Sequence, residues 1–242
     1  MNKNSNTYII VYSVVMVVVV ALLLSVTALS LQSRQNANKL NEKKNAILAS
    51  LSASDKNYDE YITAYAVNAD GEKVEADVFA QMEDLKGSFE EGIFPVFEAQ
   101  DGRVVVPVTG SGLWGPIWGY VALDSDMNTI VGAIFDHSGE TPGLGAEIAT
   151  AKHQAQYVGK QIFEGDEFVS VKLRKGGASQ ANFAHEVDAI SGGTKTSDGV
   201  SNMLADSFRN YLPFFAGRRA AAAQDAAAEV EVSNEVNNES NE

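Results

Sequence analysis

The residues best suited to chemistry in this 242-residue sequence lie together in Asp188–Ser197, which reads DAISGGTKTS. Four hydroxyl residues and a lysine flank two glycines there, between an alternating strand and an amphipathic helix. Glycine lets the backbone approach a ligand closely, and the free N–H groups and positive dipole end of a helix start attract anions. The segment therefore predicts an anion site. The plainer interpretation is a capped helix start, with Thr194 or Ser197 accepting a backbone N–H.

Two better-known sites that use these residue types are excluded. A P-loop needs glycine directly before its lysine, whereas Thr194 stands before Lys195. The S-x-x-K arrangement of penicillin-recognising enzymes is also missing, because no lysine of the sequence lies three residues after a serine.

Two segments carry a resemblance to a known family. Asp188–Thr194 resembles the flavinylation motif D-x-x-(S/T)-G-A-(T/S) of the FMN-binding domain family, with Gly193 at the position of the usual alanine. Glu140–Gly145, which reads ETPGLG, resembles a loop of the same family that borders the flavin. The surroundings of Trp114 and His137 resemble the C subunits of the sodium-pumping NADH:quinone oxidoreductases.

The resemblance implies FMN joined through its phosphate to Thr194, attached by a dedicated flavin transferase that uses FAD and magnesium. It implies an electron-relay subunit of a translocase complex with subunits A, B, D, E and F, and no catalytic residue for the overall reaction in this chain alone. No metal is expected. The other residues expected at the flavin are Asp188, Ser191, Gly192, Gly193, Lys195, Glu140, Thr141, Gly143, Leu144, Gly145, Trp114 and Lys175.

Some of these residues have two interpretations. Glu140 accepts a hydrogen bond from the flavin ring or caps a turn. Trp114 stacks on the ring or packs in the core, and stacking is expected. Lys175 turns its charge toward the phosphate or lies in a solvated hairpin turn. Leu144 is expected to cover an apolar face of the ring.

Composition excludes other classes of protein. A net charge of −14 argues against nucleic acid as a partner, because phosphate backbones are bound by clustered Lys and Arg. The absence of cysteine excludes disulfides, iron–sulfur ligation and cysteine nucleophiles. Any electron chemistry must therefore come from a bound organic cofactor or a partner.

A short N-terminal segment, residues 1–7, precedes an uncharged run over residues 8–31 that predicts one transmembrane helix. A cleaved signal peptide ending near Ala28 is the alternative. Only Lys3 precedes the run, whereas four basic residues follow it in the helical connector predicted over residues 32–54. That charge count places the domain in the cytoplasm. The resemblance instead implies the periplasmic side of the bacterial inner membrane, which is the expectation we adopt.

A single FMN-binding domain is predicted over residues 55–217, followed by a disordered acidic tail over residues 218–242. The fold class is α+β with a mostly antiparallel sheet, because several strands follow one another without helices between them. Strands are predicted at Tyr61–Val67, Val104–Val108, Ile117–Leu123, Thr129–Phe135, Val169–Arg174 and His185–Ile190, and helices at Ala76–Leu85, Ala146–Val158 and Ser197–Leu212.

Two alternatives stay open at this point. One is the corresponding flavin subunit of the ion-pumping ferredoxin:NAD oxidoreductase, which shares both motifs and differs in its partners. The other is a non-catalytic, membrane-anchored binding module whose acidic domain recognises a surface ligand.

Overall fold

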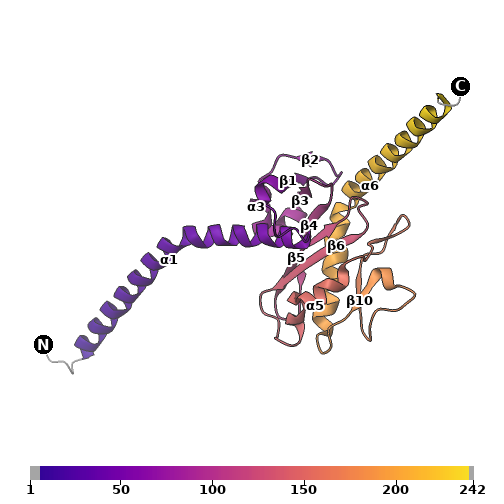
Figure 1. The fold of residues 1–242 in the computed structure, drawn as a ribbon. Helices are drawn as coiled ribbons and strands as arrows, with labels where there is room; N and C mark the ends of the chain where they lie inside the picture. The colour runs from indigo at the N-terminus through magenta and orange to yellow at the C-terminus, as the bar shows by residue number, and fades with distance from the viewer. Residues whose placement is uncertain (1–5, 240–242) are drawn as a thin grey trace. The chain divides into compact units, whose positions relative to one another are not determined.

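The computed structural model describes residues 6–239, and of residues 225–239 only the backbone. The chain divides into two compact units, Met1–Lys44 and Asn45–Glu242, each described by itself. Helix α1 (Asn6–Ser50) forms the first unit, and its last residues belong to the second (Figure 1). It is long and apolar enough to cross a membrane. The N-terminal segment predicted over residues 1–7 lies mostly outside the described residues.

The second unit is built on an antiparallel sheet in the order β2-β1-β3-β4-β5-β6 (Figure 1). Its longest pairing joins β4 (Val104–Ser111) to β5 (Pro116–Leu123) over their whole length. The start of β4 is buried on both faces, which explains its continuous apolar run. The other strands of the sheet are β1 (Ile62–Val67), β2 (Lys73–Val74), β3 (Phe94–Ala99) and β6 (Ile130–His137).

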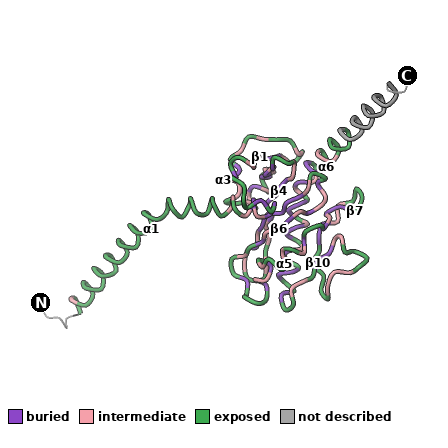
Figure 2. Tube along the Cα trace, viewed as in Figure 1, coloured by how far each residue is buried: buried purple, intermediate pink, exposed green. Residues whose placement is uncertain are grey.

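Two hydrophobic clusters cover opposite faces of this sheet, and Figure 2 shows the buried residues concentrated in the strands. Val104 and Val106 belong to one cluster and Val105 to the other, as the alternation of side chains along a strand requires. Helix α6 (Thr194–Glu239) closes the first cluster, and the end of α1 with α3 (Val78–Gln81) closes the second.

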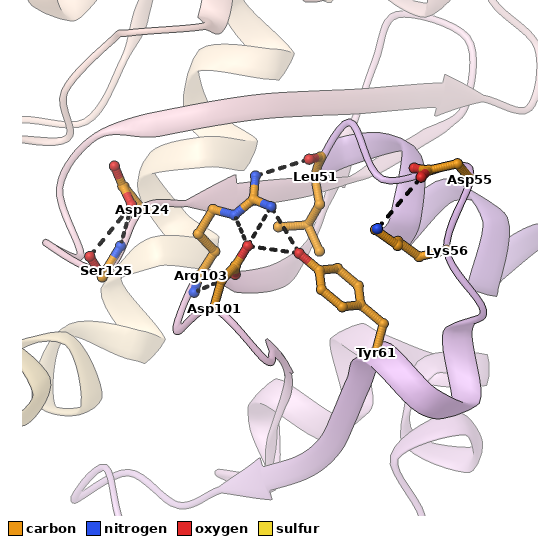
Figure 3. Close-up of polar contacts among 8 residues, drawn as sticks. All are labelled: Leu51, Asp55, Lys56, Tyr61, Asp101, Arg103, Asp124 and Ser125. Atoms are coloured by element: carbon orange, nitrogen blue, oxygen red, sulfur yellow. Dashed lines mark hydrogen bonds and ion pairs between the residues drawn. The ribbon is translucent and has the colours of Figure 1, made fainter.

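Arg103 joins the turn after β3 to the residues that follow α1 (Figure 3). Its guanidinium donates to the Leu51 carbonyl at 3.0 Å and to the Tyr61 hydroxyl oxygen at 2.9 Å. It also pairs with Asp101 at 2.6 Å. Because the last carbonyls of a helix have no partner within the helix, this contact satisfies one of them and holds the helix end against the sheet.

Smaller elements lie beside the sheet. The strands β9 (Lys172–Arg174) and β10 (Glu186–Asp188) pair in parallel, and β7 (Phe163–Glu164) and β8 (Glu167–Phe168) form a hairpin. The remaining elements are the short helices α2 (Tyr58–Tyr61), α4 (Leu85–Glu90) and α5 (Ala151–Gln154), and the 3₁₀ turns η1 (Met82–Asp84), η2 (Gly145–Ala149), η3 (Ala155–Tyr157) and η4 (Phe183–His185).

The α+β class with a mostly antiparallel sheet is confirmed, but two predicted helices are not continuous. The helix expected over Ala76–Leu85 is divided into α3 and η1, and Leu85 already begins α4. The helix expected over Ala146–Val158 is divided into η2, α5 and η3. Thr150 interrupts it, because its backbone is extended and its side chain accepts from the His153 N–H to cap α5. The last helix begins at Thr194, three residues before its predicted start.

Helix α6 continues through Glu239, so the backbone is helical over most of the residues predicted as a disordered tail. Its Ala-rich run has a high helix propensity. Arg218 pairs with Glu98 at 2.6 Å and Arg219 with Asp166 at 3.4 Å, which fixes the beginning of this part to the domain. The end of the predicted tail, residues 240–242, lies outside the described residues.

Candidate functional site

A tight turn sets the start of α6. Gly192 has a φ of +75°, in the left-handed region, and the Gly193 N–H donates to the Ile190 carbonyl at 3.0 Å. The Ser197 hydroxyl accepts from the Ile190 N–H at 3.0 Å and donates to the Gly193 carbonyl at 2.9 Å. Within the described chain, the N–H groups of residues 194–196 are left without an acceptor. Such groups at a helix start bind anions.

The four hydroxyl residues of this turn differ in exposure. Thr196 and Ser197 are buried, and the Thr196 hydroxyl donates to Glu140 Oε2 at 2.5 Å. Thr194 and Ser191 are exposed, and neither hydroxyl has a hydrogen-bond partner among the residues that the structure describes. Thr194 is also the first residue of α6, so a rigid element carries its free hydroxyl.

Glu140 lies between the elements of the site with its carboxylate buried. Oε1 accepts from the Trp114 N–H at 2.8 Å and Oε2 from Thr196, while its own N–H donates to His137 Nδ1 at 3.2 Å. Burial by itself raises the pKa of the Glu140 carboxyl. Hydrogen bonds from Thr196 and from the N–H groups of Trp114 and Leu113 outweigh burial, so the pKa is lowered and the group is ionised at neutral pH.

Glycines allow two loops to close on this carboxylate. A Cβ at Gly112 or Gly145 would collide with the carboxylate oxygens of Glu140. A Cβ at Gly192 would lie 2.7 Å from Leu144 Cδ2. The predicted loop and the predicted turn, which lie far apart in the sequence, are therefore in contact.

Large apolar side chains stay exposed around this junction. Trp114 is 68% exposed, Leu113 53% and Leu144 41%, although all three belong to well-fixed loops of the domain. Exposed apolar side chains that gather at one place commonly mark a binding site. Leu144, which lies against Gly192, therefore exposes apolar surface beside the turn that leads to Thr194.

The two lysines that were predicted at the flavin, Lys195 and Lys175, lie on elements that lead into the site. Lys195 lies in the first turn of α6 and Lys175 follows β9; both are exposed, and neither forms an ion pair with another described residue. Asp188 Oδ1 accepts from the Ala178 N–H at 2.8 Å, and the Asp188 N–H donates to Gln156 Oε1 at 2.9 Å. The Asp188 carboxylate thus holds the turn that carries Lys175 beside β10.

The remaining predicted residues shape the loop after Glu140. The Thr141 carbonyl accepts from the Leu144 N–H at 3.1 Å and from the Ala146 N–H at 3.2 Å. Gly143 has a φ of +74°, and nothing lies within 4 Å of the position a Cβ would take. Glycine is therefore required there for the backbone conformation and not for close approach.

Sequence reasoning missed the groups that support the site from the interior. A Cβ at Gly199, in the second turn of α6, would collide with the Ser111 carbonyl at the end of β4. A glycine inside a helical pattern is a visible sign of such packing. The Gln156 side chain, which accepts from the Asp188 N–H, has no comparable signal in the sequence.

Comparisons with known proteins point to one family. Residues 112–208 match the FMN-binding domain family. The C subunit of the Na(+)-translocating NADH-quinone reductase of Neisseria meningitidis is 39% identical over 125 residues, which cover 51% of this chain and 48% of that protein. The crystal structure of the same protein from Parabacteroides distasonis is 46% identical, with a TM-score of 0.71 over 76% of this chain and 96% of that chain.

This chain belongs to the NqrC family, the C subunits of the Na(+)-translocating NADH-quinone reductases. The crystal structure of Shewanella oneidensis NqrC, at 28% identity and a TM-score of 0.63, covers 76% of this chain and 99% of that one. The predicted resemblance is thereby confirmed, and the FMN-binding domain includes Trp114, the loop of Glu140 and the start of α6. The chain spans about half the length of the curated NqrC relatives it matches.

Proposed function

We propose that this chain is an electron-relay flavoprotein subunit of a sodium-pumping NADH:quinone oxidoreductase, with FMN joined through its phosphate to Thr194. The observation that carries the proposal is the exposed, unpartnered hydroxyl of Thr194 at the first position of α6, in the described chain. FMN supplies the electron transfer when bound.

The residues beside Thr194 suit a phosphoester. The free N–H groups of residues 194–196 and the positive end of the helix dipole stabilise negative charge, and the Lys195 ammonium adds to them. Lys175 is a second candidate cation for the phosphate. A threonine hydroxyl is a weak nucleophile unaided, so formation of the ester requires an external flavin transferase and its magnesium.

The apolar surface suits the flavin ring. Trp114 and Leu144 are its proposed contacts, because both side chains are exposed. Leu144 lies against Gly192 of the turn that begins α6, and the Trp114 N–H donates to the same carboxylate as Thr196. Aromatic side chains stack on flat conjugated rings. Ser191, Gly192, Gly193, Thr141, Gly143 and Gly145 shape this surface.

The proposal includes a single membrane crossing by α1 in the bacterial inner membrane, with the domain on the periplasmic side and subunits A, B, D, E and F as partners. The apolar side chains of α1 are exposed in the described chain, as in a helix whose solvent is lipid. Protease added to intact spheroplasts should digest the domain. Protection until the membrane is broken would favour the cytoplasmic side instead.

In-gel fluorescence of denatured variants, made with the transferase present, tests the attachment. Thr194→Ala should give a dark band and Thr196→Ala a fluorescent one, because the Thr196 hydroxyl is buried and bonded to Glu140. Thr194→Ser is the matched control that retains a hydroxyl. A fluorescent Thr194→Ala band would contradict the proposal, and a dark Thr196→Ala band would move the attachment two residues along the helix.

A further inference from the structure

Glu140 is a buried carboxylate that no Lys or Arg of the described chain neutralises. Its residue is 5% exposed, and no Lys or Arg among the described residues lies within ion-pair distance of it. Burying a lone charge is costly unless hydrogen bonds replace its water. Those hydrogen bonds come from Thr196 and from the N–H groups of Trp114 and Leu113. Together with the nearby His137 they outweigh burial and lower the pKa of the Glu140 carboxyl.

The same carboxylate joins parts of the site that are remote in sequence. Oε1 holds the loop of Trp114 through that residue's backbone N–H at 2.8 Å. Oε2 holds the first turn of α6 through Thr196 at 2.5 Å. Because Gly112 and Gly145 have no Cβ, both loops lie directly against the carboxylate. Both oxygens are therefore occupied by protein donors, which favours a role within the protein over direct bonding to a ligand.

The negative charge of Glu140 also lies close enough to the proposed flavin surface to affect the reduction of the flavin. The carboxylate accepts from Thr196, which is two residues from Thr194. It also accepts from Trp114, which has the most exposed large apolar side chain among the described side chains of residues 45–224. A fixed negative charge in a water-poor site acts strongly on neighbouring charge. Adding an electron to a group beside it is consequently less favourable.

We infer that Glu140 is a positioning residue that ties the Trp114 loop to the first turn of α6 and whose fixed negative charge lowers the reduction potential of the attached flavin. The inference rests on the proposed function, because the potential is that of FMN on Thr194. The tie itself concerns only groups of this chain and can be tested without flavin.

The charge is tested by the midpoint potential of the flavin on the full-length chain, with attachment verified by intact mass. Glu140→Gln keeps the shape of the side chain and removes its charge, so the potential should shift upward. Asp198→Asn is the matched control, because it removes an exposed carboxylate from the same turn of α6, where water screens it. An unchanged or lowered potential in Glu140→Gln, or an equal shift in Asp198→Asn, would overturn the electrostatic role.

The tie is tested by amide hydrogen exchange of Trp114, measured on the flavin-free Thr194→Ala chain. The Trp114 N–H donates to Glu140. Adding Glu140→Ala to the Thr194→Ala chain should therefore speed exchange of this amide at least about tenfold, and adding Thr196→Val should speed it by a smaller factor. If the alanine variant does not fold, Glu140→Gln serves, with a smaller acceleration. Unchanged exchange at Trp114 in the folded variants would overturn the positioning role.

Failure of the proposed function would look different from failure of this inference. A wild-type chain without attached FMN would overturn the function and the effect on the potential together. A flavin attached to the wild type, Glu140→Gln and Asp198→Asn chains at one common potential would overturn the electrostatic role alone.

Discussion

The first turn of α6 has two sides that are built in opposite ways. On the inward side, Thr196 and Ser197 are buried and each hydroxyl donates to a protein acceptor. On the outward side, Ser191, Thr194 and Lys195 are exposed and their side chains have no partner in the described chain. The hydrogen bonds of Thr196 and Ser197 hold the turn in place, and the side chains on the outward side take no part in this. Substitutions should therefore reduce stability on the inward side and function on the outward side.

The largest effect on stability should be that of acid, and it acts outside this turn through the buried His153 of α5. Burial lowers the pKa of His153 to about 4 from 6.5, so the unfolded chain binds the proton more readily. The part of the stability that depends on His153 should be complete above pH 6.5 and fall by about 3 kcal/mol as the pH drops from 6.5 to 4. Urea unfolding across this range measures the fall.

His153→Gln is the matched control for that titration, because it keeps a polar group beside the Tyr157 hydroxyl, which lies 3.3 Å from His153 Nε2. The stability of this variant should depend less steeply on pH than that of the wild type between pH 6.5 and 4.5. Equal slopes in the two proteins would show that another group carries the acid sensitivity.

Gly199 should give the next largest effect. In Gly199→Ala the new methyl would collide with the Ser111 carbonyl, and we expect a loss of about 2–3 kcal/mol in the free energy of unfolding. Gly217→Ala, in the same helix, has nothing within 4 Å of its new methyl and should stabilise by up to about 1 kcal/mol. Thermal unfolding of both variants measures the contrast, and equal behaviour would contradict it.

Thr196 should give a smaller loss. Thr196→Val removes the hydroxyl that donates to Glu140 Oε2 and leaves this buried oxygen without that hydrogen bond. We therefore expect the free energy of unfolding to fall by about 1–2 kcal/mol. Thr196→Ser keeps the hydroxyl and should lose less. Denaturant unfolding compares the two, and a valine variant as stable as the wild type would mean that the bond contributes nothing.

Some strands could be predicted from the sequence and others could not, and the reason is physical. The strands β4 and β5 were expected because their apolar runs are long and bounded by turns. The strand β3 was missed, since Pro95 inside it reads as a strand breaker. In the fold, Pro95 pairs with Ala66 of β1, and its carbonyl accepts from the Tyr211 hydroxyl at 2.9 Å. Such a partner, far along the chain, cannot be read from a local pattern.

The site shows the same division. Both motifs could be read from the sequence, because glycine, proline and hydroxyl residues at fixed spacing are local signals. The bond from Thr196 to Glu140 joins residues 56 positions apart, and no local pattern predicts it. The exposure that separates Thr194 from Thr196 likewise depends on the packing of α6 against the loop of Glu140.

On the outward side, the effect on stability should be smallest. Thr194→Ala removes an exposed hydroxyl with no partner in the described chain, so the free energy of unfolding should change by less than about 0.5 kcal/mol. Circular dichroism melts of the flavin-free wild type and variant give the comparison. A loss as large as that of Thr196→Val would remove the distinction between the two sides.

The intact mass of the membrane-extracted chain tests the attachment at Thr194 most directly. The wild type made with the flavin transferase should be heavier than its sequence by one FMN less one water, and the peptide that contains Thr194 should carry the difference. Thr194→Ala, made in the same way, should have the mass of its sequence. A wild type at its sequence mass, or a Thr194→Ala chain that retains the added mass, would contradict the attachment.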